Sequence, residues 1–238
     1  MFLLVYLRMY GKCLKLALQG VGKNLWTLAL PVALFLAFFV LLAPVIGSID
    51  YVGGIILSLM LDAIFSCYLY FTAGTVAMQK MTLAELKKSF LVYFWSVISV
   101  FFVLWIVRWA LGSVLSRNPQ GATIMTALYW LQLVALNAVP EVIYTKGTRG
   151  GIETITTSFK FLQENWIEWF IPNLAVIGAA WLFFTRVMPR LPAAASIPIA
   201  LAAGALFHLF MVFRGNLFEE LDGSTHRQRM FKYRNAGS

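Results

Sequence analysis

Long apolar stretches alternate with short polar connections along the whole chain. Six stretches qualify as membrane spans, because about 20 mostly apolar residues cross a bilayer core at about 1.5 Å rise per residue. These stretches are residues 25–49, 51–78, 90–115, 122–144, 166–187 and 193–213. The pattern predicts an all-α fold, a polytopic transmembrane helical bundle of about six spans.

The connections between these stretches are of two kinds. Residues 47–50, 112–121 and 188–192 form short turns. Residues 79–89 predict a short helix that opens with a capping box from Thr82 to Glu85, and residues 145–165 predict an amphipathic helix after a Gly-rich turn. We therefore expect three parts: a cytoplasmic interfacial amphipathic helix (1–24), a six-helix transmembrane domain (25–214) and a cytoplasmic charged tail (215–238).

Lysine and arginine are distributed unevenly between the two kinds of connection. Fifteen of the 19 lie in the N-terminal segment, the two longer connections and the C-terminal tail. Because positive residues accumulate in cytoplasmic loops, we expect both termini to be cytoplasmic, as an even number of spans requires. The predicted location is the cytoplasmic (inner) membrane of a prokaryote.

Composition excludes the main alternative classes. The chain is 61% hydrophobic and 12% charged, whereas soluble domains are about half apolar and a quarter charged. The net charge of +9 is spread among apolar spans and forms no separate basic domain, so we expect no nucleic-acid partner.

A weak internal repeat accompanies the alternation. Asn24 and Asn165, each seven residues before a proline, lie 141 positions apart, and the Ser-Phe pairs at 89–90 and 158–159 lie 69 apart. These offsets indicate three units of about 70 residues, each an interfacial helix followed by a helical hairpin. The identities are few, and chance similarity is the alternative explanation.

One segment carries a family resemblance. Pro140-Glu141-Val142-Ile143-Tyr144 is followed by a Gly-rich turn and then by residues 151–166, GIETITTSFKFLQENW. This pattern resembles the prokaryotic multi-pass domains of the glycerophosphodiester phosphodiesterase membrane-domain type and related families of unknown function. The match covers about a quarter of the chain and includes no soluble phosphodiesterase domain. The resemblance therefore implies a fold and not an activity.

Two opposite charges lie within predicted spans at similar depth. Asp62 is roughly 16 Å from the outer end of the second span, and Arg108 is about 10 Å from the outer end of the third. Ionisable residues at such depth are functional candidates. The structural interpretation is a buried ion pair that fixes helix register. The functional interpretation is an ion or proton site at Asp62 with Arg108 as its counter-charge.

A second candidate site lies toward the inner end. Glu141 follows Pro140 in the fourth span, and His208 lies in the inner half of the sixth. A histidine beside a carboxylate can carry protons, although such a pair can also hold helices together, and Glu141 could instead reach Lys146. Pro140 predicts a kink that frees a backbone carbonyl, with Asn137 as a nearby donor.

Basic residues outside the spans are candidates for contact with lipid headgroups or with a partner protein. They are Lys12, Lys15, Lys87, Lys88, Arg227, Arg229, Lys232 and Arg234. A juxtamembrane cysteine, Cys13, is a further candidate as an acylation site, although such a cysteine is more often silent.

Sequence motifs of known chemistry are absent from the chain. No phosphate-binding glycine loop, Gly-x-Ser-x-Gly motif or metal-binding motif occurs, and we expect no enzyme activity, cofactor or metal. The leading hypothesis is a non-catalytic scaffold or accessory subunit of a membrane complex, with the lipid bilayer and either protein partners or further copies of the chain around it. The alternative is a small transporter or channel for an ion, lipid or hydrophobic solute.

Overall fold

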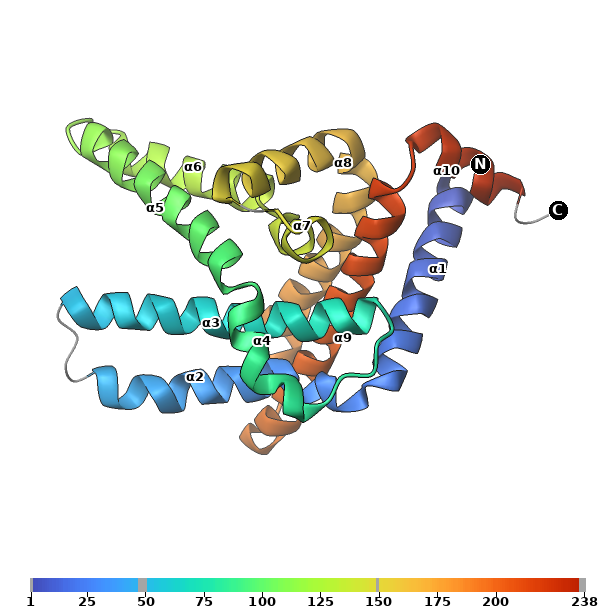
Figure 1. Ribbon diagram of the computed structural model, residues 1–238, viewed down its shortest axis with the longest axis horizontal. Helices are drawn as coiled ribbons and strands as arrows, with labels where there is room; N and C mark the ends of the chain where they lie inside the picture. The colour runs from blue at the N-terminus through green and yellow to red at the C-terminus, as the bar shows by residue number, and fades with distance from the viewer. Residues whose placement is uncertain (1, 47–50, 149, 236–238) are drawn as a thin grey trace. The chain divides into compact units, whose positions relative to one another are not determined.

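The computed structural model describes residues 2–46, 51–148 and 150–235, and these residues form helices joined by turns, with no β-strand among them. Figure 1 shows the helices along the chain. In order, they are α1 (Phe2–Lys23), η1 (Leu25–Ala29), α2 (Leu30–Ile46), α3 (Tyr51–Val76), η2 (Leu83–Glu85), α4 (Leu86–Val92), α5 (Phe94–Leu115), α6 (Gly121–Ala135), α7 (Val139–Lys146), α8 (Gly151–Leu182), η3 (Phe183–Val187), η4 (Met188–Arg190), η5 (Ala193–Ala195), α9 (Ser196–Asp222) and α10 (His226–Asn235). The all-α prediction is confirmed.

Five helical segments of the described chain are long and apolar enough to cross a membrane. They are 54–76, 83–115, 121–146, 151–190 and 196–222. A sixth span is possible where α1 and the helix after it meet at a bend of 100°. The spans expose many large apolar side chains, among them Phe35, Phe101, Trp105 and Ile177, as a lipid-facing surface does.

The chain divides into two compact units. Unit 1 comprises residues 1–47, 71–83 and 165–238, and unit 2 comprises residues 48–70 and 84–164. Helices α3 and α8 are each divided between the two units.

Three interruptions divide a polar helix from the apolar helix that follows it. Asn24 (φ −136°, ψ 48°) separates α1 from η1 and α2, and Tyr93 (φ −107°, ψ 4°) separates α4 from α5. Asn165 (φ −128°, ψ 21°) interrupts α8 in the same way. These positions lie 69 and 72 residues apart. The spacing matches the predicted repeat of an interfacial helix followed by a hairpin.

Unit 1 is held together by close helix contacts at small residues. Helix α1 packs along α9 and against α10, and α2 crosses α9. A Cβ at Gly20 would lie 2.4 Å from the Thr75 carbonyl oxygen, and a Cβ at Gly204 would lie 2.4 Å from Val32 Cγ2. Glycine at both positions therefore allows the backbones to approach more closely than any other residue would permit.

The core of unit 2 is aliphatic. Val97 and Val100 on α5 pack with Leu69 on α3 and with Val139 and Ile143 on α7. The amino end of α8 is fixed against α5, because a Cβ at position 151 would lie 2.2 Å from the carbonyl oxygen of residue 99.

Three local predictions are corrected or refined. The helix predicted at 79–89 is observed as η2 and α4; η2 begins at Leu83, directly after Thr82, and the capping box of Thr82 and Glu85 stays a prediction. The predicted kink near Pro140 is confirmed, since turn residues 136–138 separate α6 from α7. Helix α9 continues to Asp222, eight residues beyond the predicted end of the transmembrane domain at 214.

Candidate functional site

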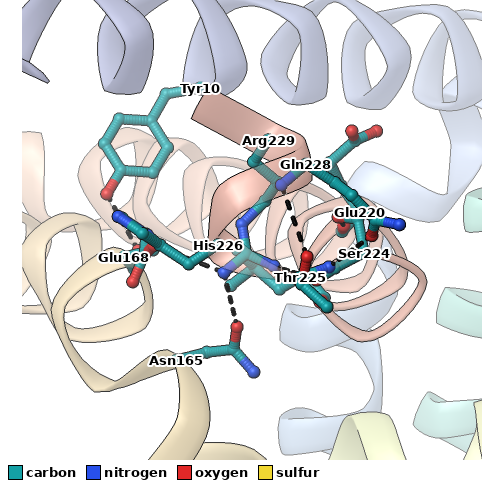
Figure 2. A network of polar contacts seen from close by, with 10 residues as sticks. Tyr10, Asn165, Glu168, Glu220, Ser224, Thr225, His226, Gln228 and Arg229 are labelled. Carbon is teal, nitrogen blue, oxygen red and sulfur yellow. Dashed lines mark hydrogen bonds and ion pairs between the residues drawn. The ribbon is translucent and has the colours of Figure 1, made fainter. Parts of the chain in front are cut away.

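An arginine of the C-terminal helix lies inside unit 1 and bonds four groups there. Arg229 donates through Nη1 to the backbone carbonyl of Leu221, at 2.9 Å, and to that of Ser224. Through Nη2 it donates to Asn165 Oδ1 at 2.8 Å and to Glu168 Oε1 at 3.3 Å. Figure 2 shows Arg229 with Asn165, Glu168 and Ser224 around it. With its side chain 3% exposed, Arg229 directs its donors to the protein interior.

Glu168 supplies the negative charge of this cluster and connects three helices. Its side chain is 5% exposed, and its Oε1 lies 2.7 Å from Nδ1 of the half-exposed His226 at the start of α10. Its backbone carbonyl accepts a hydrogen bond from the Tyr10 hydroxyl of α1 at 2.9 Å. Figure 2 shows Tyr10 and His226 on Glu168. Helices α1, α8 and α10 therefore meet at one residue.

Local sequence explains how the two sides of the cluster are placed. Glycine 223 ends α9, and the Thr225 backbone N–H then donates to the Gln228 side chain at 2.9 Å, while the Gln228 N–H donates back to Thr225 Oγ1 at 3.3 Å. This reciprocal pair is a capping box that starts α10 and brings Arg229 inward. On the other side, the backbone interruption at Asn165 precedes Glu168 by three residues, so both face Arg229.

A second ion cluster joins α1, α9 and α10 near the surface. Glu220 Oε2 lies 2.7 Å from Lys12 Nζ, and its Oε1 lies 2.5 Å from Lys232 Nζ. Arg8 Nη1 donates to the Tyr233 carbonyl at 2.9 Å, so the first and last helices lie side by side. Burial, and then the nearby Glu220 carboxylate, raise the pKa of the Tyr233 hydroxyl, which keeps it neutral.

A third cluster surrounds the other asparagine interruption. Asn24 Nδ2 donates to the Gln79 carbonyl at 2.7 Å, and Asn24 Oδ1 accepts from the Met81 N–H at 2.8 Å. Trp26 Nε1 donates to the Met81 carbonyl at 3.2 Å. Asn24 is 1% exposed. These bonds hold the segment after α3 against the junction of α1 and η1.

The predicted ion pair between Asp62 and Arg108 is wrong. Asp62 on α3 is buried, but the exposed Arg108 donates through Nε to Gln132 Oε1 at 3.3 Å and lies over the Tyr129 ring, 5.2 Å from its centroid. Asp62 and Arg108 have similar predicted depths in the membrane. Depth along a helix, however, does not determine the face of the helix from which a side chain extends.

The inner candidates are buried and belong to different units. Glu141 on α7 of unit 2 and His208 on α9 of unit 1 are both fully buried. Asn137 lies in the turn between α6 and α7, where its N–H donates to the Val134 carbonyl at 3.2 Å. The predicted Glu141–His208 pairing stays a prediction.

The basic headgroup candidates separate into two groups. Lys12, Lys15, Lys87, Lys88, Arg227, Lys232 and Arg234 are exposed. Arg229 is the correction, because its side chain is buried and its Nη1 and Nη2 groups are hydrogen-bonded within the fold. The thiol of Cys13 is also fully buried, and the cysteine is free, so acylation there would require α1 to leave its packing position.

Sequence reasoning missed the members of the Arg229 cluster on α1, α8 and α10. Asn165 was noted only as half of a repeat, and Glu168 and His226 had no motif around them. One signal was available, since Thr225-His226-Arg227-Gln228 has the form of a capping box.

No group of three His, Cys, Asp or Glu side chains that could hold a metal ion occurs in the described part of the chain. The clusters found here instead join helices to helices and loops to helices through bonds within the chain. Their chemistry is that of positioning.

Comparison of the chain with protein-family models, with curated proteins and with solved structures found no match. The resemblance to the glycerophosphodiester phosphodiesterase membrane domains therefore stays a prediction.

Proposed function

We propose that this membrane protein is a non-catalytic scaffold or accessory subunit of a membrane complex, in the prokaryotic cytoplasmic membrane. The observation that supports the proposal is the Arg229 cluster. A binding or catalytic arginine must offer donors to a substrate, whereas Arg229 directs them to Asn165, Glu168 and two backbone carbonyls.

A buried ion pair of this kind serves to fix position. Removing two charges from water costs several kcal/mol, so an internal pair gives little net stability, but it penalises any arrangement that separates its members. The cluster therefore holds α10 in one position on α1 and α8. A fixed helical end with exposed basic residues, including Arg227, Lys232 and Arg234, suits contact with anionic headgroups or an acidic partner.

The proposed orientation places this end in the cytoplasm. The positive-inside rule favours it, and the hydrogen bond from Arg8 to the Tyr233 carbonyl, which joins α1 to α10, supports an even number of crossings.

The test is mass spectrometry of the tagged protein, purified from its native membrane in mild detergent. A scaffold or subunit is expected to carry at least one other membrane protein in fixed stoichiometry. A chain that purifies alone, or with lipid only, would contradict the proposal.

A transporter is the second candidate, and Asp62 is the observation that favours it. Asp62 is 6% exposed on α3, a helix long enough to span the membrane, and buried ionisable groups at membrane depth mark ion and proton pathways. Flux into vesicles should then be abolished by Asp62→Asn at normal folded yield and unchanged by Ser58→Ala, one turn away on an exposed face. Equal flux from Asp62→Asn and wild-type protein would exclude this role.

A further inference from the structure

The hairpin of α5 and α6 exposes a permanent positive charge at membrane depth. Arg108 lies on α5, seven residues before its end at Leu115, which is about 10 Å along the helix. It is exposed, and Trp105 and Trp109 beside it on α5 are 57% and 68% exposed. A guanidinium stays protonated in proteins, so this surface keeps its charge among apolar side chains.

The Arg108 side chain extends away from the nearer membrane surface. At the tip of the hairpin the end of α5 contacts the start of α6, because a Cβ at Gly121 would lie 2.0 Å from the Leu115 carbonyl oxygen. Distances along α5 and α6 can therefore both be measured from this tip. Gln132 lies eleven residues beyond Gly121, about 16 Å along α6. Because Arg108 Nε donates to Gln132 Oε1, the Arg108 side chain extends toward the deeper level of Gln132 on α6. An arginine that reached for headgroups would extend in the opposite direction.

Neutral groups hold this charge and do not balance it. Gln132 offers an amide oxygen, and Tyr129 offers the face of its ring at 5.2 Å. Among the described residues Arg108 has no carboxylate within ion-pair distance, since Asp62, the nearest acidic residue in depth, is buried on α3.

Among the described residues, a second copy of the chain offers no suitable counter-charge at this depth. Of the ten acidic residues, Asp62 is buried and eight lie from Glu85 onward in or beside the inner connections, the inner end of α7, α8 or the tail. Asp50 lies at the predicted outer turn, outside the described residues. The described residues therefore leave the counter-charge of Arg108 to be supplied by a different chain.

We propose that the α5–α6 hairpin binds the transmembrane helix of a different protein, through an ion pair between Arg108 and an Asp or Glu within that helix. Charge complementarity selects the partner, because an acidic residue in a span needs a buried cation as much as Arg108 needs an anion. Gly112 lies one turn further along the same face of α5, and a Cβ added there would meet nothing within 4 Å. This open position lets the partner helix approach closely. The inference rests on the proposed function as a complex subunit and names its partner and contact.

The test places a photo-crosslinking amino acid at Gly112 in the full chain and irradiates native membranes. The adducts of the wild-type background, Arg108→Gln, Arg108→Lys and Arg117→Gln are then identified and quantified by mass spectrometry. Arg117 is the matched control, an exposed arginine at the tip of the same hairpin. Folded yield is measured in parallel by gel filtration.

The expected result is a crosslink to a span of another protein with an Asp or Glu level with Arg108. Its yield should fall about tenfold in Arg108→Gln, be partly retained in Arg108→Lys and be unchanged in Arg117→Gln. Exchanging the charges, with Arg108→Glu and the partner's acid changed to Lys, should restore it.

The inference would be overturned by an adduct with a second copy of this chain, by an adduct with lipid only, or by an Arg108→Gln yield equal to wild type. An Arg108→Gln yield equal to wild type, with partner proteins still present in the purified complex, would leave the proposed function standing and refute the Arg108 contact alone. A wild-type chain that neither crosslinks to a protein nor purifies with one would refute both.

Discussion

Asn24 and Asn165 occupy equivalent junctions and have nearly the same backbone, yet their side chains serve different contacts. Both are buried, and both interrupt the chain where a polar helix gives way to an apolar one. Asn24 bonds main-chain groups of Gln79 and Met81. Asn165 bonds the charged side chain of Arg229. One type of junction therefore holds a neutral loop in one repeat and a charged terminal helix in the other.

The difference shows that equivalent junctions of a repeated architecture can make different side-chain contacts. The backbone interruption belongs to the repeat, since it recurs at Tyr93, where the N–H donates to Ser66 Oγ at 3.0 Å. The group that bonds the junction residue differs from one repeat to the next. A main-chain partner tolerates many sequences, whereas the partner of Asn165 requires an arginine at one position of α10. We expect the charged junction to be the more sensitive of the two.

The largest effect is expected from Arg229→Met, which removes the guanidinium and leaves Glu168 buried without its permanent counter-charge. Breaking one member of a buried pair costs about 3–5 kcal/mol. Unfolding in mixed micelles titrated with SDS should show this loss, and α10 should become accessible to protease. The matched control is Arg227→Met, an exposed neighbour on the same helix, for which we expect a change of about 0.5 kcal/mol or less.

A double variant identifies the cause. If charge burial dominates the loss, Glu168→Gln combined with Arg229→Met should recover part of the stability of Arg229→Met. A double variant as unstable as the sum of the two single changes would instead mean that the arginine acts through its carbonyl contacts at Leu221 and Ser224.

Asn24→Ala is expected to rank second. It removes the side-chain bonds to Gly20, Gln79 and Met81 and leaves the buried Met81 N–H without its acceptor, at a cost of about 2–3 kcal/mol. Gln79→Ala is the control, because Gln79 contributes only its backbone carbonyl to the contact and its side chain is exposed. SDS-titrated unfolding measures both. A loss for Asn24→Ala equal to or greater than that for Arg229→Met would reverse the proposed ranking of the junctions.

The architecture was predictable because lipid imposes strong patterns on sequence. The lengths of the apolar stretches predict the membrane spans, and the spacing of Asn24 and Asn165 predicts the repeat. The break before α5 could not be located by the same residue type, because position 93 is a tyrosine and the other two junctions have asparagine. There the Tyr93 N–H donates to Ser66 Oγ on a different helix, and sequence spacing cannot reveal this contact.

The polar contacts were less predictable because they depend on which face of a helix a residue occupies. Asp62 and Arg108 agreed in depth, but Arg108 faces outward on α5 beside Gln132. Arg229 was grouped with its exposed neighbours because the tail is rich in charge, and only the turn at Gly223 and Thr225 directs it inward. Both errors concern rotation about a helix axis, to which counting along a span is insensitive.

The third prediction exchanges amide for carboxylate at the two junctions. Asn24→Asp replaces the donor to the Gln79 carbonyl with an oxygen and buries a charge, which should cost about 1–3 kcal/mol. Asn165→Asp keeps an acceptor for Arg229 and gives it a charged one, so we expect a change within about 1 kcal/mol. Comparing the two unfolding transitions checks this asymmetry. Equal losses at both positions would mean that the identity of the partner does not distinguish the junctions.

The smallest effect is expected at the turn that directs Arg229 inward. Thr225→Ala removes the acceptor for the Gln228 N–H while the helix after it keeps its sequence, and loss of an N-cap side chain costs about 1 kcal/mol. Thr225→Ser keeps the hydroxyl and should retain most of the stability. Hydrogen exchange of the first turn of α10 should rise in Thr225→Ala and not in Thr225→Ser. If the Arg229 contacts alone hold this helix, both variants will exchange like wild type, and the charged junction will have proved independent of the cap that precedes it.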